Sequence, residues 1–263
     1  MMNVLPSAQK QIQTACTLIE NILGSELMAI HLYGSAMDGG LKPLSDIDLL
    51  VTVRSPLRDE QRHALMQQLL AVSAWPGTSE IYRALEVTVV VWSQMVPWRF
   101  PPVRELQFGE WLRDAILNDE YEPAQPDPDL AILLTKARQN SLALRGEAAS
   151  TLYEAVPERD LQQTFRQTLA LWNGAEDLEG DERHILLTLA RIGYSVETGQ
   201  IAAKDEAAAW LMPQLPAAHA KLLAEARAEY LGKVTVNWTE KMPQVEAFVR
   251  DVKKAIEKKL ALS

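Results

Sequence analysis

The spacing of hydrophobic positions changes near residue 157 of this 263-residue chain. Before that point, short apolar runs typical of β-strands alternate with segments of helical spacing. Strands are predicted over residues 27–33, 46–53 and 82–92, and helices over residues 7–24 and 59–72. The first part of the chain therefore reads as a mixed α/β domain.

Beyond residue 157, strand signals disappear and apolar residues recur every three or four positions, with glycines at the breaks. Helices are predicted over residues 159–172, 181–198, 205–211, 216–231 and 243–262. The pattern predicts an α+β protein, with an α/β domain over residues 1–157 and an all-α helical bundle over residues 158–263. One more helix, predicted from Asp127 to about Leu144, can pack with either domain.

Two aspartates at the start of the second predicted strand are the first candidates for chemistry. Asp46 and Asp48 project from one face of a strand, about 6.6 Å apart at roughly 3.3 Å per residue. Ile47 and Leu49 point the other way, into a core. Neighbouring carboxylates repel each other unless a proton or a cation lies between them. Mg²⁺ is the natural cation, because it shares its ligand sites between carboxylates, water and phosphates.

The groups that would bind a phosphate lie in the turn Gly34-Ser35 and at Ser45. Glycine allows the backbone to approach a phosphate, and serine hydroxyls and N–H groups can donate to it. The chain has neither a Walker A sequence nor a kinase glycine-rich loop followed by a strand lysine. Phosphate binding is therefore assigned to these residues and to cations elsewhere in the chain.

A lone glutamate, Glu86, interrupts the third predicted strand. An uncompensated carboxylate in a hydrophobic strand costs on the order of several kcal/mol, which favours a metal ion or a proton as its partner. Glu86 is therefore a candidate metal ligand together with Asp46 and Asp48. It is also a candidate general base for an acceptor hydroxyl, which is the role we favour. The competing interpretation of the aspartate pair is a solvated strand edge.

Charge and composition restrict the partners. A net charge of −9 and a pI near 5.1 argue against a nucleic-acid substrate and favour a cationic one. The single cysteine, Cys16, excludes an internal disulfide, and four scattered histidines disfavour a zinc site. No signal-peptide pattern and no apolar run of roughly 18 residues occurs, so we expect a cytoplasmic protein without a membrane partner.

The motifs together resemble a known family. Gly-Ser followed by Ser-Asp-Ile-Asp and a later strand glutamate resembles the nucleotidyltransferase superfamily, which has a polymerase-beta-like fold. The fuller set resembles the aminoglycoside (3'')(9) adenylyltransferase family up to about residue 235. It includes His-Leu-Tyr-Gly-Ser-Ala (31–36), Arg-Ala-Leu-Glu-Val-Thr-Val (83–89), Glu-Leu-Gln-Phe-Gly-Glu-Trp-Leu-Arg (105–113) and Thr-Gly-Gln-Ile-Ala-Ala-Lys-Asp (198–205).

This resemblance implies a nucleotidyltransferase domain over residues 1–157 and a C-terminal helical domain over residues 158–263. It implies transfer of AMP from ATP to the 3''-hydroxyl of streptomycin or the 9-hydroxyl of spectinomycin, with release of pyrophosphate and resistance to the drug. Mg²⁺ is the expected cofactor, with two ions the usual number for such an in-line displacement. A monomer is expected.

Candidate substrate-binding residues follow from the family match and from the cationic drug. They are Trp111, Asp177, Asp181 and His184, which would supply an aromatic face and acids for guanidinium or amine groups. Each has an ordinary alternative. Trp111 can be a core residue, Asp181 a helix N-cap, and Asp177 and His184 solvated surface residues.

For ATP, the match adds Arg191, Lys204 and Tyr230 to Ser35 and Ser45. Two cations suit a triphosphate, and a tyrosine can stack on adenine or bond to a phosphate. An interior ion pair for Arg191 and a core contact for Tyr230 are the alternatives. Two rival functions stay open: a nucleotidyltransferase that acts on a protein or another metabolite, and a non-catalytic nucleotide sensor. The three acids disfavour the sensor.

Overall fold

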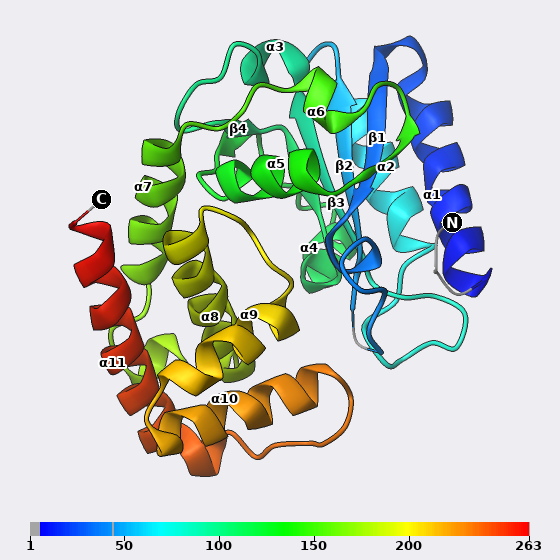
Figure 1. Ribbon diagram of the computed structural model, residues 1–263. Helices are drawn as coiled ribbons and strands as arrows, with labels where there is room; N and C mark the ends of the chain where they lie inside the picture. The colour runs from blue at the N-terminus through cyan, green and yellow to red at the C-terminus, as the bar shows by residue number, and fades with distance from the viewer. Residues whose placement is uncertain (1–5, 44, 263) are drawn as a thin grey trace. The chain divides into compact units, whose positions relative to one another are not determined.

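The chain forms two compact units, Met1–Val156 and Pro157–Ser263, in a computed structural model that describes residues 6–43 and 45–262. The first unit contains a mixed β-sheet with helices on both faces (Figure 1). The described part of the second unit is helical. The predicted α+β fold class, with a mixed sheet followed by a helical bundle, is therefore confirmed.

The main sheet of the described residues has five strands in the order β5-β3-β2-β1-β7. The strands β2 and β3 are parallel, and the pairs β1–β2, β1–β7 and β3–β5 are antiparallel. Their bounds are β1 Leu27–Tyr33, β2 Ile47–Val53, β3 Leu85–Val91, β5 Leu106–Phe108 and β7 Leu142–Arg145. A separate two-stranded sheet pairs β4 (Val103–Arg104) with β6 (Gln125–Pro126).

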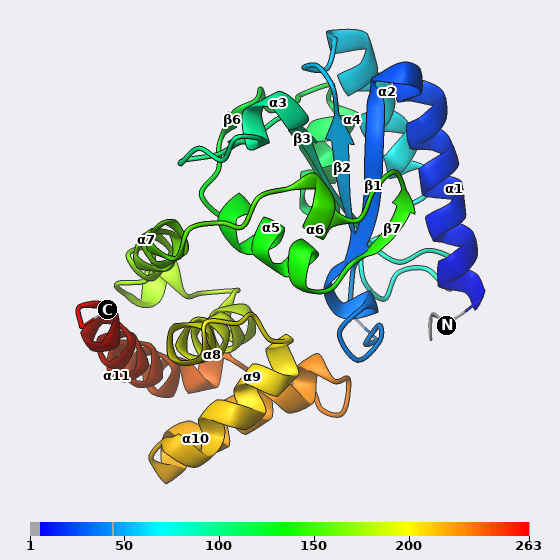
Figure 2. The same ribbon diagram turned by 45° about the horizontal axis from the view of Figure 1, so that its top comes forward.

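The two faces of the main sheet carry different cores. The helices α1 (Pro6–Leu23) and α2 (Asp59–Leu70) cover one face, where they pack on residues such as Leu49 and Val87. The helices α5 (Leu130–Gln139) and α6 (Ala149–Leu152) cover the other face, with Leu50 and Val90 beneath them (Figure 2). Because side chains alternate along a strand, the even-numbered positions of β2 and β3 point to this second face. The short helices α3 (Trp92–Met95) and α4 (Arg113–Leu117) complete the unit.

The sequence prediction is wrong at one helix of this unit, and it did not include the short strands β4, β5 and β6. The helix expected from Asp127 to Leu144 ends as α5 at Gln139, and residues 142–145 form β7 instead. Asn140 has an extended backbone, which ends the helix, and Leu142 and Leu144 then pack against the core under α1. Strand pairing with β1 supplies the backbone partners that the helix would have supplied.

The second unit contains the five predicted helices. They are α7 (Glu158–Leu169), α8 (Glu182–Thr198), α9 (Lys204–Leu211), α10 (Ala217–Tyr230) and α11 (Met242–Leu260). The helix α8 packs against the other four, and its Leu186, Leu189 and Ile192 are buried. Gly199, with φ of +70°, ends α8 in the left-handed conformation that glycine favours. No helix within the described residues has the length and hydrophobicity to cross a bilayer.

Candidate active site

Two of the three predicted acids lie directly opposite each other. Asp48 on β2 and Glu86 on β3 are partners in the parallel ladder, and both side chains are partly exposed on the face away from α1 and α2. Neighbouring strands are about 4.8 Å apart, so the two carboxylates share one small area. Asp46 lies one residue before β2 and is also partly exposed.

The Gly34 turn lies against Asp48. Gly34 begins a 3-10 turn (Gly34–Ala36) at the end of β1 and has φ of +71°. A Cβ at this position would lie 1.8 Å from Asp48 Oδ2. Glycine is therefore required both by the backbone conformation and by the close approach of the Asp48 carboxylate.

Serines follow Gly34 and precede Asp46 in the chain. The Ser35 Oγ is buried and has no hydrogen-bond partner in the part of the chain that the structure describes. A buried hydroxyl without a partner is costly, so this atom is well suited to a ligand oxygen. The Ser45 Oγ accepts a hydrogen bond of 3.1 Å from the Lys42 N–H, which leaves its own proton available for donation.

Arg83 supports the loop that carries Ser45 and Asp46. One guanidinium nitrogen, Nη1, donates to the carbonyl oxygens of Lys42 at 2.8 Å and of Ser45 at 3.1 Å. Sequence reasoning missed this residue, because nothing in its local pattern distinguishes it from a surface arginine. Its position three residues before Glu86 places it where β3 approaches the same loop.

Glu86 also has a neighbour that the sequence did not indicate. Gln107 on β5 donates from Nε2 to Glu86 Oε1 at 3.3 Å, and its Oε1 accepts a bond of 2.9 Å from the Thr88 hydroxyl. Thr88 and Gln107 are paired residues of the β3–β5 ladder. A row of three side chains therefore ends at the Glu86 carboxylate.

Trp111 is a surface residue, so the core alternative for it is wrong. The residue is 54% exposed and lies in the 3-10 turn Glu110–Leu112 that follows β5. The turn is anchored by buried Glu110, which forms two hydrogen bonds with the Arg113 guanidinium at 2.7 and 2.9 Å. The Trp111 ring lies over Gly109, where a Cβ would be 2.2 Å from ring atom Cζ3.

In the second unit, the structure brings the predicted cations close to His184. Lys204 Nζ lies 5.9 Å from the centroid of the Tyr230 ring, a cation–π distance. The pKa of His184 is lowered to about 4 by burial against surrounding protein and by the positive charges of Lys204, Arg191 and Arg183. Although more than a third of the residue is exposed, the three cations favour the neutral imidazole at pH 7.

The two aspartates before α8 differ in their bonding. Asp181 occupies the N-cap position, but its side chain makes no capping hydrogen bond and is exposed. Asp181 therefore stands where an N-cap residue stands, but its carboxylate is not used to cap the helix. Asp177 is exposed and accepts hydrogen bonds from the N–H groups of Asn173 at 2.8 Å and Gly174 at 3.2 Å, which fixes the loop around it.

The donor set suits a magnesium site that a substrate completes. Within the described residues, no three His, Cys, Asp or Glu side chains are arranged to hold a metal ion by themselves. Mg²⁺ is usually bound by one or two carboxylates together with water and phosphate oxygens. The Asp48–Glu86 pair beside the unpartnered Ser35 hydroxyl fits that arrangement.

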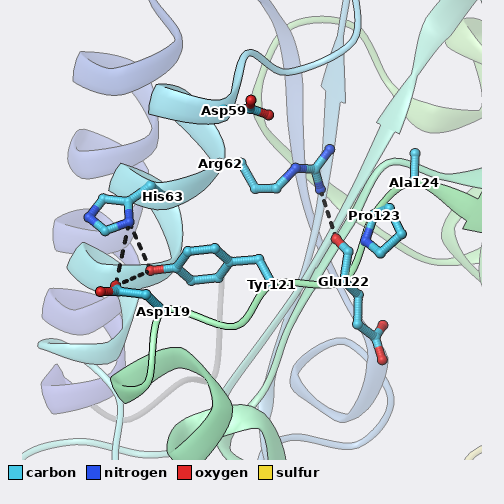
Figure 3. Close-up of a pocket in the computed structure, with 8 residues that line it drawn as sticks. All are labelled: Asp59, Arg62, His63, Asp119, Tyr121, Glu122, Pro123 and Ala124. Carbon is cyan, nitrogen blue, oxygen red and sulfur yellow. Dashed lines mark hydrogen bonds and ion pairs between the residues drawn. The ribbon is translucent and has the colours of Figure 1, made fainter.

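A separate pocket of about 580 Å³ opens elsewhere on the first unit (Figure 3). None of the predicted site residues lines it. Several of its polar side chains bond to one another. The Tyr121 hydroxyl lies 2.9 Å from His63 Nδ1 and donates to Asp119 Oδ1 at 2.9 Å. We therefore assign it no part in the chemistry.

Comparison with protein families gives two matches. Residues 18–101 match the family model described as nucleotidyltransferase domain. Residues 151–255 match the model described as aminoglycoside adenylyltransferase, C-terminal domain. The two matches follow the order of the two compact units.

Relatives match over nearly the whole chain. The chain is 52% identical to an aminoglycoside (3'')(9) adenylyltransferase of Escherichia coli, with 97% of each chain covered. It is 40% identical to a spectinomycin 9-adenylyltransferase of Staphylococcus aureus, with 92% of this chain and 93% of the relative covered.

A solved structure has the same fold. It is the crystal structure of a spectinomycin adenyltransferase from Enterococcus faecialis with ATP and spectinomycin. The TM-score is 0.87 at 27% identity, and the match covers 95% of this chain and 99% of that one. Sequence and fold agree: the chain belongs to the aminoglycoside (3'')(9) adenylyltransferase family.

Proposed function

We propose that this protein transfers AMP from MgATP to a hydroxyl of an aminoglycoside antibiotic, the 3''-hydroxyl of streptomycin or the 9-hydroxyl of spectinomycin. Pyrophosphate is released, and the modified drug no longer acts on the cell that makes the enzyme. The observation that carries this proposal is the pairing of Asp48 with Glu86 beside the Gly34 turn. The names of the relatives and the two ligands of the solved neighbour support it.

In this proposal, Asp46, Asp48 and Glu86 would hold Mg²⁺, with two ions the expected number. When bound, the metal would supply positive charge for the phosphate oxygens and for the attacking and leaving oxygens. Glu86 accepts the proton of the drug hydroxyl, and the resulting oxygen forms a bond to the α-phosphorus of ATP. The bond from that phosphorus to the bridging oxygen breaks, and the electron pair leaves with pyrophosphate.

ATP is bound by Ser35, Ser45, Arg191, Lys204 and Tyr230. The buried Ser35 hydroxyl gains a phosphate oxygen as its partner. The two cations match the charge of the triphosphate, and this supply of positive charge matters in a protein with a net charge of −9.

The drug is bound by Trp111, Asp177, Asp181 and His184. The exposed Trp111 ring offers a face for a guanidinium group, and the exposed carboxylates offer charge. A neutral His184 supports the same assignment, because an imidazolium would repel a cationic ligand. We expect a monomeric enzyme of the cytoplasm, where MgATP is supplied.

The direct test is to mix the protein with MgATP and single aminoglycosides and to search by mass spectrometry for a drug heavier by one AMP. Glu86→Gln should abolish transfer while ATP binding, measured by calorimetry, stays near the wild-type value. Full activity in this variant would refute the role of Glu86 as base. Pyrophosphate release only with a protein or another metabolite as acceptor would refute the drug as substrate.

A further inference from the structure

We infer that Gln107 is a positioning residue for the Glu86 carboxylate, and that Thr88 holds the Gln107 amide in place. This inference rests on the proposed function, in which Glu86 removes the proton of the acceptor hydroxyl. It adds two residues of the first unit to the machinery, neither of which binds substrate itself.

The first observation is the bond between the two side chains. Gln107 Nε2 lies 3.3 Å from Glu86 Oε1, and β5 carries it to the same face of the sheet. A carboxylate at the end of a flexible side chain has many orientations, and a general base must direct one oxygen at the proton it accepts. A donor fixed on the neighbouring strand reduces that freedom before the substrate arrives.

The second observation is the hydrogen bond that holds the other end of the Gln107 amide. Thr88 is 1% exposed, and its hydroxyl donates to Gln107 Oε1 at 2.9 Å. If the amide were reversed, the Gln107 oxygen would face the Glu86 carboxylate, which is a repulsive contact, whereas the Thr88 hydroxyl could turn and accept a bond from the NH₂ group. The Glu86 carboxylate therefore selects the orientation of the amide, and the buried Thr88 hydroxyl holds the amide by donating to its oxygen.

The third observation is the burial of the row. Gln107 is 9% exposed, so its amide has little access to water as an alternative partner. In such an environment, hydrogen bonds to charged groups are stronger than in water. A surface glutamine placed by chance would not have both amide atoms engaged by two neighbouring side chains.

The test compares Gln107→Leu, Thr88→Val and the double variant with wild type in steady-state adenylylation of streptomycin and spectinomycin. We expect kcat to fall about 10- to 100-fold in Gln107→Leu with both drugs, while KM for ATP stays within about twofold. Thr88→Val should lower kcat less, and the double variant should be no slower than Gln107→Leu. Gln61→Leu is the matched control, because Gln61 on α2 is another buried amide, whose oxygen accepts a bond from the N–H of Arg58, the N-cap of that helix.

Several results would overturn the inference. One is a kcat of Gln107→Leu within twofold of wild type. Another is an equal rise in KM for ATP and for the drug, which indicates general disruption of the site. A third is a double variant whose loss of kcat is the product of the two single losses, because Thr88 and Gln107 would then act independently. If Gln107→Leu does not fold, a wild-type kcat in the nearly isosteric Thr88→Val variant overturns the inference. A wild-type protein inactive on both drugs refutes the proposed function itself, and this role with it.

Discussion

Replacing Gly109 with alanine tests whether the Trp111 ring is the surface on which the drug lies. Gly109 has φ of −165° and ψ of 159°, an extended conformation that any residue adopts, so alanine adds no backbone strain. Its Cβ would lie 2.2 Å from Trp111 Cζ3, where ordinary contact begins at 3.4 Å. The ring must therefore move by about 1 Å, and a displacement of that size in a substrate-positioning group can cost about 100-fold in rate.

The assay is kcat/KM for each drug at saturating MgATP. We expect a fall of about 10- to 100-fold for streptomycin and a smaller one for spectinomycin, because a guanidinium stacks on an indole better than an amine does. Trp111→Ala should likewise lower kcat/KM more for streptomycin than for spectinomycin. The double variant should be no worse than Trp111→Ala, since the three atoms nearest the new Cβ all belong to the Trp111 ring.

The control is Gly193→Ala on α8, where the added Cβ would meet Ile256 at 3.7 Å, an ordinary contact. It should keep the wild-type kcat/KM for both drugs. Because the Trp111 ring is exposed, the melting temperature of Gly109→Ala should stay close to that of wild type. An unchanged streptomycin kcat/KM in Gly109→Ala, or losses that add in the double variant, would refute the reasoning.

Two other predictions follow from the first unit. Gly34→Ala should abolish transfer, because its Cβ would lie 1.8 Å from Asp48 Oδ2 and displace that carboxylate. Left-handed strain alone should lower the free energy of unfolding by about 1–2 kcal/mol. A variant that is active in kinetic experiments and as stable as wild type in melting experiments would contradict this. Burial lowers the pKa of His31 below its ordinary 6.5, against the raising effect of its bond to the Glu147 carbonyl. The unfolded chain therefore binds the proton more readily, and stability is lost as pH falls below about 6.5. Thermal melts from pH 7 to pH 5 should show a smaller fall for His31→Asn than for wild type.

The helical unit was predicted well because its signals are local. The apolar face of α8 repeats at helical spacing, and Gly199 provides the stop at its end. By contrast, β7 was missed because its four residues follow a helix and gain their backbone partners from β1, more than a hundred residues earlier. Only the alternation of Leu142 and Leu144 indicates the strand in the sequence, and two positions are too few to outweigh the helical pattern before them.

The acids of the candidate site could be found from the sequence because a carboxylate within an apolar strand is conspicuous. Their supports could not be found in that way. Gln107 has a role only because β5 pairs with β3, and Gly109 only because the Trp111 ring turns back over it. Likewise, the sequence did not decide whether Trp111 was buried. Such residues become visible only when segments distant in the chain are placed side by side.

The edge strand β5 has a consequence for how the enzyme can evolve. Its three residues and the turn after them hold both the partner of Glu86 and the seat of Trp111. In the function that we propose, a mutation that reshapes this segment to admit a new antibiotic also disturbs the alignment of Glu86. The same segment would then affect both kcat and the range of drugs accepted. Variants selected here for a broader range should therefore have a low kcat at first, and compensating changes on β3 should restore it.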